Sequence, residues 1–165
     1  MNAFTKTALA TSMALGLALP GIATAGDQDA PIVVQSQAAM AEWQAEVNAD
    51  LSRNMMRVGR TPNHTPRGVV QVAFTLDADG SPTDFVTYSS SGDRRTDRAA
   101  RLALSRLDNL DAAPVSNVGN ARFIANMIFA NSPADHKTLT AQLDKREKAR
   151  LARGDAMSEA ITLGG

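Results

Sequence analysis

The sequence contains no cysteine, few aromatic residues and no net charge. The absence of cysteine excludes disulfide crosslinks and also a lipoprotein anchor, which is attached through a cysteine. Aromatic residues make up 4% and all hydrophobic residues 44% of the 165 residues, so the core must consist mainly of aliphatic side chains. The 17 basic residues balance the 17 acidic ones. There is therefore no overall positive field to attract nucleic acid, and we expect no nucleic acid partner.

Residues 1–25 have the three-part layout of a secretory signal peptide. Lys6 gives a weakly positive start, an apolar stretch follows, and Ala23 and Ala25 are the small residues that a signal peptidase recognises. We expect cleavage after Ala25, export to the periplasm and no stable membrane insertion afterwards. The alternative is an uncleaved anchor. It needs roughly 20 apolar residues, whereas this stretch is shorter and is interrupted by Pro20.

Apolar residues recur at spacings of three and four between residues 36 and 58, which is typical of an amphipathic helix. Ser36 can cap this helix at its start, and Gly59 can end it. The short polar segment before it, residues 26–35, is predicted to be a linker. The apolar stripe consists of Met40, Trp43, Val47, Leu51, Met55 and Val58.

Two strands joined by a tight turn are predicted next. From Gly68 to Asp77, apolar residues alternate with polar or small ones, which is the pattern of a half-buried strand. The segment from Asp77 to Gly80 has turn chemistry, and residues 83–89 are rich in β-favouring side chains. Together they predict an antiparallel hairpin.

A second helix and a third strand complete the predicted domain. The helix starts at a cap formed by Asp93 or Thr96 and runs to about Leu107, and the strand covers residues 123–130, which are apolar on both faces. We therefore predict an α+β fold, with a small three-stranded antiparallel sheet packed by helices, over residues 36–131.

The last segment, residues 132–165, is predicted to be a charged helical tail. Ser132 and Pro133 are a typical helix start, and Leu139 and Leu143 are the apolar pair at helical spacing. Because this pair can contribute little core, we expect the domain to stay folded when the tail after Pro133 is removed. The tail also carries a basic cluster, which is either a solvated helix face or a weak contact for anionic lipid or another acidic surface. The cluster consists of Lys145, Arg146, Lys148, Arg150 and Arg153.

No residue is predicted to be catalytic, metal-ligating or cofactor-binding. His64 and His136 lack a second ligand at zinc spacing, and both are interpreted as surface histidines. The sequence around Asp77 resembles a fragment of a calcium loop, but the later ligands are missing, so a turn is the better interpretation. The serine run 89–91 lacks the Gly-x-Ser-x-Gly frame of a nucleophile. We therefore expect a protein that is not an enzyme and that needs no cofactor.

Several motifs together resemble the C-terminal domain of the TonB family. They are a Gly-led alternating strand with an Asp-x-x-Gly turn from Gly68 to Gly80, Ser-Ser-Gly at 90–92, Asp-Arg-Ala-Ala at 97–100, and the late strand 123–129. The resemblance covers residues 39–131. It implies a cell-envelope interaction module to which an extended partner segment, such as one from an outer-membrane receptor, adds as a strand. Because the family binds at its last strand, the resemblance implies an edge formed by Arg122, Phe123, Ala125, Asn126, Met127 and Phe129.

The sequence departs from the family in the parts that transmit force. A TonB transducer has an uncleaved anchor and a long proline-rich spacer, whereas residues 26–35 are a short linker after a cleavable-looking signal. At about 3.6 Å per residue, such a linker cannot bridge the envelope. We therefore expect an interaction module that is linked to TonB-dependent transport without being a transducer itself. The alternatives are a homo-oligomeric structural envelope protein, such as a homodimer, or an anchored transducer if the N-terminus is not cleaved.

Overall fold

The computed structural model describes residues 29–59, 64–154 and 156–165, and their side chains from residue 36 onward. The predicted signal peptide, residues 1–25, lies outside this part of the chain, so both the signal peptide and its cleavage after Ala25 stay predictions. The helices and strands of the described residues are, in chain order, α1 (Asp29–Val58), β1 (Gly68–Leu76), β2 (Pro82–Ser89), α2 (Arg94–Leu104), the 3-10 turn η1 (Val118–Asn120), β3 (Phe123–Phe129), α3 (Pro133–Leu151) and β4 (Ile161–Gly164).

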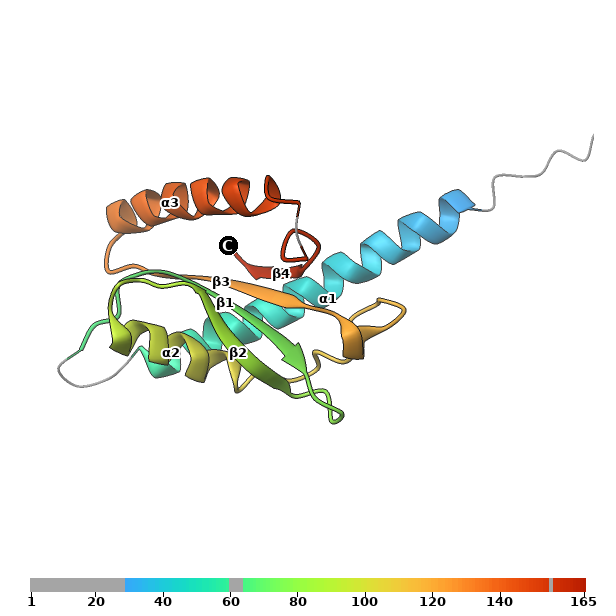
Figure 1. Ribbon diagram of the computed structural model, residues 1–165, viewed down its shortest axis with the longest axis horizontal. Coiled ribbons are helices and arrows are strands. Elements are labelled where there is room, and N and C mark those ends of the chain that lie inside the picture. The colour runs from blue at the N-terminus through green and yellow to red at the C-terminus, as the bar shows by residue number, and fades with distance from the viewer. Residues whose placement is uncertain (1–28, 60–63, 155) are drawn as a thin grey trace, which may run out of the picture.

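Helix α1 confirms the predicted apolar stripe but begins earlier than predicted. Its first residue is Asp29 rather than Ser36, so most of the segment predicted as a linker has helical backbone. Trp43, Val47 and Leu51 are buried because their spacing places them on one side of the helix. Figure 1 shows that the first turns of α1 extend beyond the sheet.

β1 and β2 form the predicted hairpin. Asp77 Oδ1 accepts hydrogen bonds from the backbone N–H groups of Asp79 at 3.0 Å and Ser81 at 2.9 Å, which closes the turn. Gly80 has a φ of 77°, a conformation that glycine adopts without strain. The Asp77 side chain therefore serves the turn, as predicted.

Helix α2 begins directly after Asp93, which resolves the choice between its two predicted caps. The Asp93 side chain accepts hydrogen bonds from the backbone N–H groups of Arg95 and Thr96. Thr96 instead donates its hydroxyl to Asp93 at 2.8 Å. Ala100 and Ala103 are fully buried, and these small side chains allow α2 to lie close to α1 and the sheet.

The sheet has four strands in the order β2-β1-β3-β4, which corrects the prediction of three antiparallel strands. β1 pairs antiparallel with β2 and β3, whereas β4 pairs parallel to β3. The prediction that β3 is the edge strand is wrong, because the C-terminal residues return to the sheet beside it. Helix α3 supplies the crossover that a parallel pair requires.

Each face of the sheet carries its own layer of helices. α1 and α2 cover the face that bears the even-numbered residues of β1, and α3 covers the opposite face (Figure 1). Phe74 and Phe123 stack within the first layer, with ring centroids 5.1 Å apart, an arrangement that adds to the energy of burial. The main core therefore lies between the sheet and the α1–α2 pair.

The C-terminal tail is part of the domain, contrary to the expectation that it contributes little core. Leu139 and Leu143 of α3 are buried against Val69. Leu163 of β4 is fully buried in the main core. The sequence showed Leu139 and Leu143 but not that they pack against the sheet, and it gave no strand to the segment that contains Leu163.

Candidate functional site

Strand β4 is shorter than β3 and divides it into two halves. The pairing begins at Phe123 with Ile161 and ends at Asn126 with Gly164. The second half, Met127–Phe129, is paired with β1 on one side. On its other side the described residues provide no strand. This half of β3 is therefore an open stretch of edge beside the end of β4.

The backbone of Ile128 is directed toward this open side. The N–H of Ile161 in β4 donates to the carbonyl of Arg122 at 2.8 Å, so the even-numbered residues around β3 direct their backbone groups toward β4. Backbone groups alternate in direction along a strand. Ile128 consequently presents its N–H and C=O beyond the point where β4 has ended.

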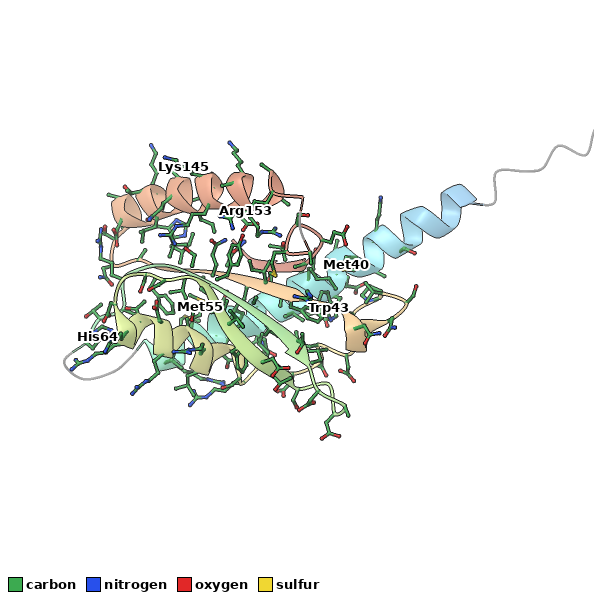
Figure 2. The ribbon with its side chains drawn as sticks, in the orientation of Figure 1. Met40, Trp43, Met55, His64, Lys145 and Arg153 are labelled. Atoms are coloured by element: carbon green, nitrogen blue, oxygen red, sulfur yellow. The ribbon has the colours of Figure 1, made fainter. Side chains whose placement is uncertain are left out.

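An open groove of about 420 Å³ lies at this position. Its apolar walls come from Leu51, Met55 and Met56 of α1 and from Ile128 and Phe129 of β3. Met56 is 60% exposed. Its neighbour Met55, also on α1, is labelled in Figure 2. The polar part of the lining is formed by Ser52, Thr65, Asn126, Asn131 and His136, and Gly165 lies at one end.

The outer edge of β4 is closed by side chains of α1. Gln44 Nε2 donates to the carbonyl of Thr162 at 3.2 Å, and Asn48 Oδ1 accepts from the N–H of Gly164 at 2.7 Å. These two amides satisfy backbone groups that another strand would otherwise use. An incoming strand therefore cannot add beyond β4 without displacing α1.

The opposite edge of the sheet, β2, is guarded in a different way. Pro82 lacks a backbone donor, and Asp84 has a φ of 52°. The pairing of β2 with β1 also contains register shifts. Proline, charge and bulges are features that discourage edge pairing. Because the edge of β2 is guarded in this way, the second half of β3 is the better candidate for strand addition.

The structure separates the residues that were predicted to form the partner edge. Phe123, Ala125 and Met127 have fully buried side chains in the main core, and Phe129 is 7% exposed. The carbonyl of Arg122 is already bonded to β4, although its side chain is exposed.

Asn126 faces the α3 layer instead, where its Oδ1 accepts a hydrogen bond from Gln71 at 2.9 Å. The stretch from Arg122 to Asn126 is therefore occupied by β4, and the predicted edge is corrected to its last residues, Met127 and Phe129, which flank the open stretch.

Other parts of the groove were not predicted. Met56 is outside the apolar stripe of α1, and Ile128 was not among the residues named for the edge, although its strand was. His136 and Gly165 belong to segments that were given no site role. One sequence signal could have revealed the arrangement: Ile161-Thr162-Leu163 is rich in β-branched residues, which favours a fourth strand.

An ion pair holds one end of the groove together. Arg67 Nη2 lies 2.5 Å from Asp135 Oδ1, and the N–H of Asn131 donates to Asp135 Oδ2 at 3.2 Å. The hydrogen bond from Arg67 lowers the pKa of the Asp135 carboxyl, with a further contribution from Asn131. The same hydrogen bond raises the pKa of Arg67. The loop before β1 is thereby fixed to the start of α3.

The serines after β2 have a structural partner rather than a catalytic one. The hydroxyls of Ser90 and Ser91 donate to Asp97 at 2.5 and 2.7 Å. Burial raises the pKa of Asp97, but the hydrogen bonds from Ser90 and Ser91 outweigh burial, so the pKa is lowered. These bonds tie the end of β2 to the first turn of α2.

The two histidines differ from each other in exposure. His136 is exposed, as predicted, whereas the side chain of His64 is only 18% exposed, with Nε2 3.1 Å from Asp93 Oδ2. That contact lacks the alignment of a hydrogen bond. The hydrogen bond from the Thr96 hydroxyl lowers the pKa of Asp93, followed by the bond from the Arg95 N–H and, more weakly, by His64. His64 therefore contacts a helix cap and not a serine hydroxyl.

Within residues 29–59, 64–154 and 156–165, no group of three or more metal-ligating side chains comes together. In the same part of the chain, no helix combines the length and the hydropathy needed to cross a bilayer. Comparisons with family models, curated proteins and solved structures find no match for this chain.

Proposed function

We propose that this chain is a non-enzymatic binding module that takes up an extended segment of a partner protein by strand addition. The observation that supports this proposal best is the open half-edge of β3. Ile128 directs its backbone groups into a groove with apolar walls, at the point where β4 has ended. In strand addition, such backbone groups supply affinity, and neighbouring pockets supply selectivity.

The groove favours a short segment with alternating apolar side chains. Residues 127–130 span roughly 13 Å at about 3.3 Å per residue, so a segment of about four or five residues fills the open stretch. Alternate side chains of an added strand point to opposite sides. One set would contact Met55 and Met56, and the other would lie toward His136 at the start of α3.

The partner belongs, in this proposal, to the cell envelope. The predicted signal peptide favours the periplasm, and the resemblance of residues 39–131 to TonB C-terminal domains favours an outer-membrane receptor and a link to TonB-dependent transport. The homo-oligomeric alternative loses part of its support, because the two-sided apolar character of β3 is explained by its interior position in the sheet.

A matched pair of variants tests whether the groove binds extended peptides. Met56 and Leu102 are both exposed apolar residues on helices, at 60% and 44% exposure, but Leu102 does not line the groove. Peptides are selected from a random display library against the purified protein, and their affinity is measured by calorimetry. Met56→Glu is expected to weaken binding on the order of tenfold, which corresponds to about 1.4 kcal/mol, and Leu102→Glu to leave it nearly unchanged.

N-methylation of the selected peptides distinguishes strand addition from docking of side chains alone. Because every second amide of an added strand faces β3, N-methyl groups at one set of alternate positions should abolish binding, and those at the other set should not. If neither set matters, or if Met56→Glu binds as well as Leu102→Glu, strand addition at this groove is the wrong mechanism.

A further inference from the structure

A second cavity, of about 150 Å³, lies between α3 and the end of β2. It shares no lining residue with the groove beside β3. Apart from Ala149, every residue that lines it carries a polar or charged group, although their carbon atoms also form part of the wall. The polar side chains are those of Gln71, Tyr88, Ser89, Arg146, Arg150 and Arg153.

One of the three arginines is neutralised within the protein. Arg150 is 2% exposed, and its Nη2 and Nε lie 2.7 and 3.0 Å from the carboxylate of Glu147. It also donates to the carbonyl of Met157 and to the hydroxyl of Thr162. Arg150 therefore holds α3 to the C-terminal strand and has little capacity left for a ligand.

The other two arginines have no carboxylate partner among the described residues. Arg146 Nη1 donates to the carbonyl of Val69 at 3.0 Å. Arg153 Nη1 donates to the hydroxyl of Tyr88 at 3.1 Å, with its guanidinium 5.8 Å from the centre of that ring. Each guanidinium has five N–H donors, so both keep donors for another partner.

These contacts hold two positive charges at one small cavity. With Arg150 and Glu147 included, three guanidinium groups and one carboxylate give a local charge of 3 − 1 = +2. Like charges that line the same small cavity repel each other, and neutral partners such as the carbonyl of Val69 and the hydroxyl of Tyr88 do not offset that repulsion. A bound anion would offset this repulsion.

The remaining basic residues of α3 behave differently. Lys145 and Lys148 are exposed, and Figure 2 shows Lys145 pointing away from the sheet and Arg153 toward it. The basic cluster seen in the sequence is therefore two groups, a solvated pair of lysines and a set of arginines directed at the sheet.

We infer that this cavity binds a phosphate group. Guanidinium groups match phosphate oxygens in geometry and form charge-assisted hydrogen bonds with them, and the hydroxyl of Ser89 adds a neutral donor. The volume of about 150 Å³ is well below the roughly 300–1,000 Å³ of sites for drug-sized ligands. The cavity therefore takes a single phosphate group, carried by a soluble phosphate ester or by a lipid headgroup, with the rest of the molecule outside.

Titration with inorganic phosphate tests the site, with chloride used to keep the ionic strength constant. The backbone amides of Ser89 and Ala149 are followed by NMR, and a saturable shift is expected. Arg146→Gln and Arg153→Gln are each expected to weaken binding about tenfold, since charge-assisted hydrogen bonds are among the strong ones. The matched controls Lys145→Gln and Lys148→Gln remove the same charge from the same helix and should change binding less than about twofold.

Arg146→Gln removes the hydrogen bond to Val69 and can therefore also lower the stability of the fold. Arg153→Gln is the decisive variant, because Arg153 is exposed and its replacement is expected to leave the fold intact. The absence of a saturable shift would overturn the inference. So would an equal loss of binding in Arg153→Gln and the two lysine variants, since that result would mean diffuse attraction to the helix.

Vesicles distinguish the two sources of phosphate. Binding to phosphatidylglycerol vesicles, but not to phosphatidylcholine vesicles, that is lost in Arg153→Gln and kept in Lys145→Gln supports a lipid headgroup. Saturable binding of inorganic phosphate without vesicle binding supports a soluble phosphate ester.

Discussion

The two faces of the sheet are joined to their helices by different kinds of interaction. Toward α1 and α2, β1 presents apolar residues such as Val72, which is fully buried. Toward α3, the same strand presents Gln71, which is equally buried and donates to Asn126 Oδ1 at 2.9 Å and Glu147 Oε1 at 2.6 Å. Glu147 in turn binds Arg150. One strand therefore carries an apolar core on one side and, on the other, a polar network beside the smaller apolar cluster of Val69, Leu139 and Leu143.

The two faces contribute differently to the stability of the fold and to the positions of its elements. Apolar packing is non-directional and grows with buried area. A buried polar network contributes only when every member has its partner, and it penalises any shift that breaks a bond. We therefore expect the α1–α2 face to supply most of the free energy of folding, and the α3 face to fix the position of α3 and β4.

The largest loss of stability is expected from a charged side chain placed in the apolar face of the sheet. Val72→Asp would bury an unpaired carboxylate, which costs several kcal/mol against a total stability of about 5–15 kcal/mol. No cooperative melting transition should be observed by circular dichroism. Val86→Asp is the control. Because Val86 is 61% exposed on β2, this variant should melt at nearly the wild-type temperature. A cooperative melt of Val72→Asp at the wild-type temperature would refute the assignment of the main core.

Removal of the chain after Pro133 is expected to have the next largest effect. It takes away α3 and β4, which uncovers Val69, leaves Gln71 without Glu147 and removes the buried Leu163. A large fall in melting temperature is expected, in contrast to the expectation from the sequence. A shorter truncation after Ala160 removes β4 alone and should give an intermediate melting temperature. Equal melting temperatures for the full and truncated chains would show that α3 is not needed to cover the sheet.

Breaking the polar network is expected to cost less than either of these changes. Arg150→Met leaves the Glu147 carboxylate partly buried without its partner, a change that costs about 3 kcal/mol or more. Glu147→Leu combined with Arg150→Met removes both charges and should recover part of that loss. A double-mutant cycle with urea denaturation measures the coupling. If the two substitutions are additive, the network does not act as a unit.

The smallest changes in stability are expected from replacing a carboxylate in the first turn of α2 or of α3, the helices on the two faces of the sheet. The pKa of Asp97 at the start of α2 lies below its ordinary value of 3.8. A lowered pKa in the folded state means that its contribution to stability is complete above about pH 4 and is lost as the pH falls through the folded pKa. Asp97→Asn should therefore be less stable than the wild type at pH 7, and this difference should shrink in acid.

Asp135→Asn at the start of α3 should show the same dependence on pH with a smaller amplitude, because its partner Arg67 is 62% exposed and ion pairs with a solvent-exposed partner contribute little. Urea denaturation at several pH values measures both variants. A constant difference between wild type and Asp97→Asn down to pH 2 would contradict the role given to the Asp97 carboxylate.

The sequence placed the candidate partner edge along all of β3, whereas β4 pairs with its first half and leaves only its last residues open. The apolar run of β3 attracts attention because it lacks charge and proline, and Met127 and Phe129 do flank the open stretch. Phe123 and Ala125 have the same apolar character for another reason: they lie between β1 and β4 in the sheet. An interior strand and an unprotected edge strand look alike in sequence, because both are apolar on two faces.

The sequence by itself determined the local elements of this protein. The alternating strand from Gly68, the turn at Asp77 and the start of α3 at Ser132 depend on residues close together in the chain, and each forms as predicted. Only the tertiary structure decided which strand lies at the edge, where β3 is left open, and which arginines of α3 face the sheet. These features depend on contacts between distant segments, such as Asn48 with Gly164 and Gln71 with Glu147. Their partners are selected when the whole sheet and its helices pack together.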